Sequence, residues 1–160
     1  MAYLGAVAVI LAVYMIWREY SSMLSGELEW CRRFLKALTD YRDKIRCYMD
    51  TPGRWAAEYP DGKLRDCGFL TYLGECGDFG RAYSQTNASM NVSAEVDATL
   101  KTCFDRLGEG YLETELETLG TAIEQLKRTE EGLSVSYSKR RKAVGALLGA
   151  FASGVVILVM

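Results

Sequence analysis

The sequence predicts an all-α protein: a helical bundle with a long antiparallel, coiled-coil-like stalk, anchored by N- and C-terminal transmembrane helices. Three observations predict this fold. All 19 basic and 21 acidic residues lie between Arg18 and Lys142, so that residues 1–17 and 143–160 carry no charge. Two stretches of the charged part repeat apolar residues every three to four positions, which is the helical period. The chain has only two prolines, which permits long helices.

The two uncharged runs are predicted to be transmembrane helices. An apolar helix of about 17–25 residues spans a bilayer, and both runs lie at the short end of this range. A cleaved signal peptide is the alternative for residues 1–17, but no Lys or Arg precedes the run and no small-x-small site follows Trp17. A buried core helix is the alternative for residues 143–160, but the preceding cations favour a membrane anchor.

The basic residues beside these runs predict the topology. Four consecutive cations precede the second run: Lys139, Arg140, Arg141 and Lys142. Arg18 follows the first run, and no Lys or Arg lies on the outer side of either. The positive-inside rule therefore makes residues 18–142 cytoplasmic and leaves both termini outside the cell membrane. The block is interpreted as a topology and lipid-headgroup device, with a nucleic-acid patch as the alternative.

Small residues recur at helix-packing spacing in both uncharged runs. Such residues let helix backbones approach closely in lipid. We expect the two runs to pack together or against other membrane subunits through Gly5, Ala8, Ala12, Gly145, Gly149 and Gly154.

The first stalk helix is predicted over residues 18–49, running straight on from the first transmembrane helix. Its apolar stripe consists of Leu24, Leu28, Cys31, Leu35, Leu38, Ile45 and Met49. This spacing resembles a heptad repeat over nearly four heptads. We expect the helix to end near Asp50.

Residues 50–111 are predicted to form a helical cap. Thr51-Pro52 reads as an N-cap followed by proline at the first helical position, so a short helix should run to Tyr59. After a turn, a third helix is expected from Gly62 or Lys63 to about Tyr83, and residues 84–92 read as a loop. Ser93 should cap a fourth helix, which the glycines at 108 and 110 end.

The second stalk helix is predicted over residues 112–142, running without a break into the second transmembrane helix. Its stripe consists of Leu112, Leu116, Leu119, Ile123, Leu126, Leu133 and Tyr137. Acidic residues come first and basic residues last, which suits the helix dipole. The two stalk helices have similar predicted lengths, so they should pair antiparallel over roughly 45–50 Å, with the cap at the tip or packed alongside.

The composition excludes most catalytic chemistry. The chain contains no histidine, which removes imidazole-based triads, dyads and zinc sites. The five cysteines include no CxxC pair and read as buried, reduced thiols. No phosphate-binding loop of the form GxxxxGK[ST] is present, and the net charge of −2 argues against nucleic-acid binding. We therefore expect no enzymatic activity, cofactor, metal or small-molecule substrate.

The order of several short motifs resembles the stage III sporulation protein AB (SpoIIIAB) family. The motifs are Leu4-Gly5-Ala6, Thr51-Pro52, Leu107-Gly108 and the Gly145–Gly149 pair within residues 144–149. Gly53 replaces the leucine that follows Thr-Pro in the family. Where the family continues its Leu-Gly with Asp and Gln, this chain has Glu113 and then Leu116 or Glu117. The family is also similar to GspF-type platform proteins of secretion machines.

The resemblance implies a non-enzymatic membrane platform in a sporulation channel complex of the SpoIIIA–SpoIIQ kind. Members lie in the mother-cell membrane around the forespore. The implied partners are a cytoplasmic SpoIIIAA-like ATPase and other SpoIIIA-type membrane subunits. We expect the ATPase to bind at the stalk tip, through Thr51, Pro52, Gly53, Arg54, Leu107, Gly108, Glu109 and Gly110.

Two other interpretations remain open at this stage. Thr51, Pro52 and Gly108 can equally be helix caps with no role in binding. A two-span membrane signalling protein is the alternative function, although it would have almost no segment outside the membrane with which to sense. An enzyme ranks third.

Overall fold

The computed structural model describes residues 2–48, 51–108 and 111–159, and all regular structure within these ranges is helical. The prediction of an all-α fold is therefore confirmed. The helices are α1 (Ala2–Tyr48), α2 (Pro52–Glu58), α3 (Gly62–Asp66), α4 (Phe69–Cys76), α5 (Phe79–Thr86), the 3₁₀ helix η1 (Asn87–Ser89), α6 (Ala94–Phe104) and α7 (Leu112–Val159).

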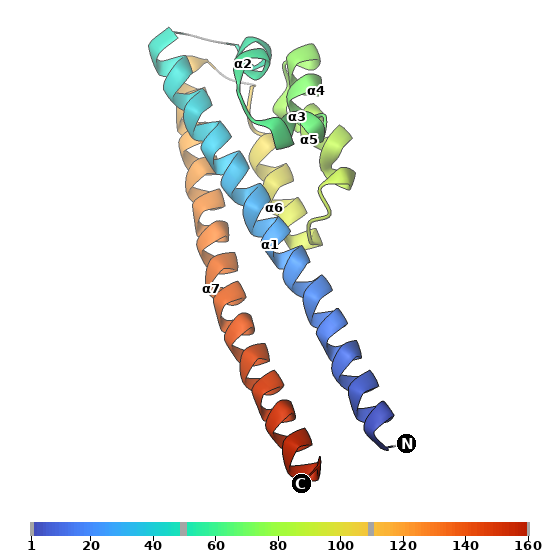
Figure 1. The fold of residues 1–160 in the computed structure, drawn as a ribbon. Coiled ribbons are helices and arrows are strands. Elements are labelled where there is room, and N and C mark those ends of the chain that lie inside the picture. The colour runs from blue at the N-terminus through green and yellow to red at the C-terminus, as the bar shows by residue number, and fades with distance from the viewer. Residues whose placement is uncertain (1, 49–50, 109–110, 160) are drawn as a thin grey trace.

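The two long helices form an antiparallel hairpin, with both chain termini at one end and the short helices toward the other (Figure 1). Helix α1 continues without a break through Arg18, and α7 continues without a break through Lys142, as the sequence predicts. The predicted stalk helices thus exist as parts of these longer helices. The predicted end of the first at Asp50 lies outside the described residues.

The predicted transmembrane helices at 1–17 and 143–160 are not supported by the described part of the chain. No helix among the described residues combines the length and the apolar character needed to cross a membrane. A helix needs about 20 apolar residues to span a bilayer. Before Arg18, the side chains of α1 are described without a gap only from Ile10 onward, which is a shorter stretch. The side chains of residues 1–6, 8, 9, 148, 149 and 151–160 lie outside the described ones.

Helix α1 is buried on two faces, of which the sequence indicates only one. The predicted stripe is largely buried, through Leu24, Leu28, Cys31, Leu38 and Ile45. A second set, Trp30, Phe34, Ala37 and Tyr41, is buried against the cap. The cap therefore packs alongside α1, where Figure 1 shows α4, α5 and α6. This is the second of the two predicted arrangements.

Aromatic rings form the centre of the interface between α1 and the cap. Phe34 is fully buried, and its ring centroid lies 5.1 Å from that of Phe69 and 5.0 Å from that of Phe104, both edge to face. Tyr83 approaches the same ring at 6.0 Å. Edge-to-face pairs add stabilisation beyond burial of area. One side chain of α1 thus ties together α4, α5 and α6.

The predicted third helix is wrong in its extent, because two glycines break it. Gly68 has φ +88° and Gly77 has φ +66°, both in the left-handed region that favours glycine. The result is three short helices, α3, α4 and α5. Asp61 and Asp78 cap α3 and α5 by accepting the backbone N–H of Leu64 and Arg81, respectively.

The predicted loop over residues 84–92 is shorter than expected. Helix α5 extends to Thr86, and η1 occupies Asn87–Ser89. Thr86 is buried, and its hydroxyl donates a hydrogen bond to the carbonyl of Ala82 at 2.8 Å, so its polar group is satisfied within the helix. Helix α6 begins after Ser93, as predicted, although the Ser93 side chain makes no capping hydrogen bond.

We expect Phe34→Ala to destabilise the protein by about 3–5 kcal/mol, because it leaves a cavity among four helices. The free energy of unfolding, measured by chemical denaturation of the full chain, checks this. Tyr72→Ala is the control, since Tyr72 is an exposed ring on α4, and it should change that free energy by roughly 0.5 kcal/mol or less. Equal effects of the two substitutions would contradict the central position of Phe34.

Candidate functional site

The first group of predicted partner-binding residues begins helix α2. Thr51 Oγ1 accepts the backbone N–H of Arg54 at 3.4 Å, and Pro52 occupies the first turn, so their capping role is confirmed. A Cβ on Gly53 would lie 3.1 Å from the carbonyl oxygen of Gly74, which makes Gly53 a point of close approach between α2 and α4. Thr51 and Arg54 are exposed, so a partner could reach both.

The second group of predicted residues behaves differently. Leu107 is buried and packs in the core, so its predicted role in partner binding stays a prediction. Gly108 has φ +92° and is exposed. Glu109 and Gly110, also predicted to bind a partner, lie outside the described residues.

Glu115 holds the backbone of Gly108, and the sequence did not single out this residue. Its carboxylate accepts the backbone N–H of Gly108 on both oxygens, at 3.0 and 2.9 Å. Burial raises the pKa of Glu115, and the hydrogen bond from Gly108 opposes this rise. An acidic residue in the first turn of α7 was expected for the helix dipole, but its pairing with Gly108 depends on the path of the intervening turn.

The two groups contact different helices of the cap. Leu107 and Gly108 help to line an open polar depression of about 380 Å³ beside α5, whereas Gly53 packs on α4. Next to the second group, the ring of Tyr111 is 92% exposed. The predicted tip residues thus belong to two surfaces on different elements, with Tyr111 as a further candidate for partner binding. The sequence did not mark Tyr111.

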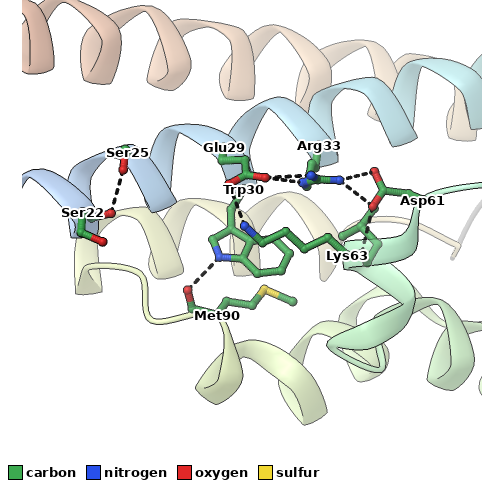
Figure 2. A network of polar contacts seen from close by, with 9 residues as sticks. Ser22, Ser25, Glu29, Trp30, Arg33, Asp61, Lys63 and Met90 are labelled. Atoms are coloured by element: carbon green, nitrogen blue, oxygen red, sulfur yellow. Dashed lines mark hydrogen bonds and ion pairs between the residues drawn. The ribbon is translucent and has the colours of Figure 1, made fainter.

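A network of ion pairs joins α1 to α3 (Figure 2). The Glu29 carboxylate accepts hydrogen bonds from Arg33 Nη2 and Lys63 Nζ, both at 2.7 Å. Arg33 Nη1 also donates to both oxygens of Asp61, at 2.8 and 2.9 Å. Through these hydrogen bonds, Lys63 and then Arg33 hold the pKa of Glu29 below its ordinary value. We call these four residues the α1–α3 clamp.

Two further contacts attach α1 to the segment between η1 and α6. Trp30 Nε1 donates to the carbonyl of Met90 at 2.8 Å, as Figure 2 shows. One turn earlier on α1, Glu27 is 2% exposed, and its carboxylate accepts the backbone N–H of Ser93 at 2.5 Å. This bond satisfies the backbone N–H of Ser93, the residue that precedes the first turn of α6.

The basic block lies farther along α7, where this helix passes from its charged to its uncharged part. Lys139, Arg140, Arg141 and Lys142 are all exposed. The Arg140 guanidinium lies over the ring of Tyr20, 5.1 Å from its centroid, so the block on α7 meets α1 two residues from Arg18. The two helices therefore change from charged to uncharged sequence at the same level.

The predicted packing of the two uncharged runs on each other is not found in the described residues. Ala12 and Gly145 are exposed, and a Cβ on Gly145 would meet no atom within 4 Å. The helices move apart toward their termini in Figure 1. The physical reason is that Leu24 is the first buried side chain of α1 among the described residues, so extensive apolar packing against α7 begins only there. The side chains of Gly5, Ala8, Gly149 and Gly154 lie outside the described ones.

The thiols divide into buried and accessible ones, which corrects the prediction that they are all buried. All five cysteines are free. Cys31 and Cys103 are buried, Cys67 is partly buried, and Cys47 and Cys76 are exposed. Burial raises the pKa of Cys31 to about 12, which suppresses its thiolate. The described residues contain no group of three or more Cys, Asp or Glu side chains that could hold a metal ion.

We expect Glu29→Gln to weaken the acid dependence of stability. Because the folded-state pKa of Glu29 is depressed, its contribution is complete above the unfolded value near 4.5 and is lost as pH falls through the lower folded value. Free energies of unfolding measured between pH 3 and pH 7 check this. The variant should be less stable at pH 7 and should lose less stability on acidification.

Glu124→Gln is the matched control, since it removes the same charge from an exposed ion pair with Arg128. Such pairs contribute little to stability, so its pH profile should follow that of the unchanged protein. Parallel profiles for Glu29→Gln and the unchanged protein would show that the α1–α3 clamp does not stabilise the fold.

Compared with known proteins, the chain matches no protein-family model, no curated protein and no solved structure. The resemblance to stage III sporulation protein AB therefore stays a hypothesis that the short sequence motifs carry.

Proposed function

We propose that this chain is a non-enzymatic, membrane-anchored scaffold whose helical hairpin presents a docking surface to a cytoplasmic ATPase. One observation carries the proposal: the uncharged parts of α1 and α7 leave the bundle at the same end, and both begin at the level where Arg140 covers Tyr20 (Figure 1). With a membrane surface at this level, the charged parts of both helices would lie in water and the uncharged parts in hydrocarbon.

The exposed apolar side chains beyond this level support membrane attachment. Those described on α1 are Val7, Leu11, Val13, Tyr14, Met15 and Ile16, and Leu147 is exposed on α7. Ile16 is 69% exposed, which is unfavourable in water and favourable in hydrocarbon. The proposal has the two helix ends insert in the cell membrane, with the basic block at its cytoplasmic surface and both termini outside.

The motif resemblance supports the more specific role. A SpoIIIAB-like chain would be a platform in a SpoIIIA–SpoIIQ-like complex, in the mother-cell membrane around the forespore. Its partners would be a SpoIIIAA-like ATPase and other SpoIIIA-type membrane subunits. At the tip, exposed Arg54 and Tyr111 belong to the residue types that contribute most at protein interfaces.

The first test concerns topology in cells. A reporter active only outside the membrane, fused to either terminus of the full chain, should be active, because the proposed cytoplasmic cap leaves both ends outside. The same reporter inserted after Asn91, an exposed residue of the cap, is the control and should be silent. A cytoplasmic signal from either terminus would refute the hairpin topology.

The second test concerns the tip. We expect Arg54→Glu with Tyr111→Ala to weaken binding of the ATPase to the detergent-solubilised full chain by about tenfold or more, because truncating Arg or Tyr at an interface centre costs over 1 kcal/mol. The dissociation constant measured by calorimetry checks this. Lys127→Glu with Val135→Ala makes the same kinds of change on the exposed surface of α7 and should leave binding unchanged. Undiminished binding by the tip variant would rule out this docking surface.

A further inference from the structure

An apolar crevice lies between α1 and α7 at the level where the charged and the uncharged parts of both helices meet. Trp17, Tyr20 and Leu24 line it from α1, and Tyr137 and Val144 line it from α7. Its volume is about 150 Å³. An apolar protein cavity of about this size admits a molecule as large as benzene, so the crevice can hold about six carbons of a hydrocarbon chain.

The geometry of the two helices keeps the crevice open toward the uncharged ends. Above it, the buried side chains of Leu24 and Leu28 close the space within the bundle. Below it, Ala12 and Gly145 are exposed, and the helices move apart (Figure 1). A chain of hydrocarbon could therefore enter from below but could not pass further into the bundle.

Two arginines of α7 contribute to the lining of this crevice. Arg140 and Arg141 both line it, and the contact of Arg140 with the Tyr20 ring holds one guanidinium at its edge. A wider polar groove of about 560 Å³ shares Tyr20, Leu24 and Arg140 with the crevice and continues toward Ser93. The apolar crevice, the Arg140 guanidinium at its edge and the polar groove thus adjoin one another, as do the acyl chain, the phosphate and the headgroup of a phospholipid.

We propose that this crevice binds one anionic phospholipid, with part of an acyl chain between α1 and α7 and its phosphate against Arg140 and Arg141. Guanidinium groups bind phosphate oxygens in a two-pronged geometry, and Trp and Tyr favour the border between headgroups and hydrocarbon. The inference rests on the proposed membrane attachment and adds a defined lipid site to it.

The dimensions and the charges favour a lipid over other occupants. A transmembrane helix of a partner is about 10 Å wide, so even one turn of it occupies a larger volume than the 150 Å³ of the crevice. A free phosphate ion would use the arginines but not the apolar walls. General attraction to an anionic membrane surface would use Lys139 and Lys142 as much as Arg140 and Arg141, whereas only the two arginines line the crevice.

Trp17 provides a reporter inside the crevice. The other two tryptophans, Trp30 and Trp55, are buried in the bundle, out of reach of lipid chains. The full chain is reconstituted in phosphatidylcholine vesicles containing a small fraction of lipid brominated on the acyl chain, which is either phosphatidylglycerol or phosphatidylcholine. We expect brominated phosphatidylglycerol to quench the fluorescence at a mole fraction lower by on the order of fivefold for each arginine engaged.

Two double variants separate the site from the surface charge. Arg140→Gln with Arg141→Gln should abolish the preference for phosphatidylglycerol. Lys139→Gln with Lys142→Gln removes the same charge from the same block and should retain the preference. Ser21→Leu, which fills the crevice without changing charge, should reduce quenching by either lipid. Circular dichroism of each variant should match that of the unchanged protein.

The outcomes distinguish this inference from the proposed function. Vesicle association without preference for phosphatidylglycerol, or equal loss of preference in both double variants, would overturn the lipid site and leave membrane attachment standing. Binding of inorganic phosphate to the detergent-solubilised chain, lost in the double arginine variant, together with equal quenching by the two brominated lipids, would assign the arginines to a free anion and overturn the lipid site as well. Failure of the unchanged chain to float with any vesicle would overturn both.

Discussion

The simultaneous burial of two faces of α1 is the constraint on which the rest of the structure depends. One face packs in the hairpin with α7, and the other receives the aromatic rings of the cap around Phe34. None of the short cap helices exceeds Ala94–Phe104 in length, and helices this short are marginal alone in water. Their helical state therefore depends on the apolar surface that α1 offers them.

Polar contacts from α1 then fix where each cap segment lies along it. Glu29 and Arg33 reach the start of α3, Trp30 reaches the end of η1, and Glu27 reaches the start of α6. Apolar packing is nondirectional and tolerates sliding of one surface over another. Hydrogen bonds to single backbone or charged groups do not tolerate it, so these contacts select one register of the cap on α1.

The sequence is sufficient to predict the long helices, because their apolar stripes repeat over many turns. It does not reveal the second buried face of α1, since a helix buried on two sides loses the contrast between apolar and polar faces. The breaks at Gly68 and Gly77 were missed because glycine is tolerated within helices, and only the tertiary path decides whether φ becomes positive. The pairing of Glu115 with Gly108 escaped prediction because it joins the ends of two different helices, whose relative placement is a tertiary property.

The packing of α1 and α7 changes at the level where Arg140 contacts Tyr20. Above it, α1 and α7 share a buried stripe and hold the cap. Below it, most of the described side chains are exposed and the helices part. Two diverging helices with exposed apolar side chains gain free energy from any apolar medium that enters between them. The chain itself supplies no third helix there among the described residues. The space between the helix ends is thus suited to an apolar occupant, and the cation–π contact between Arg140 and Tyr20 marks the level at which this space begins.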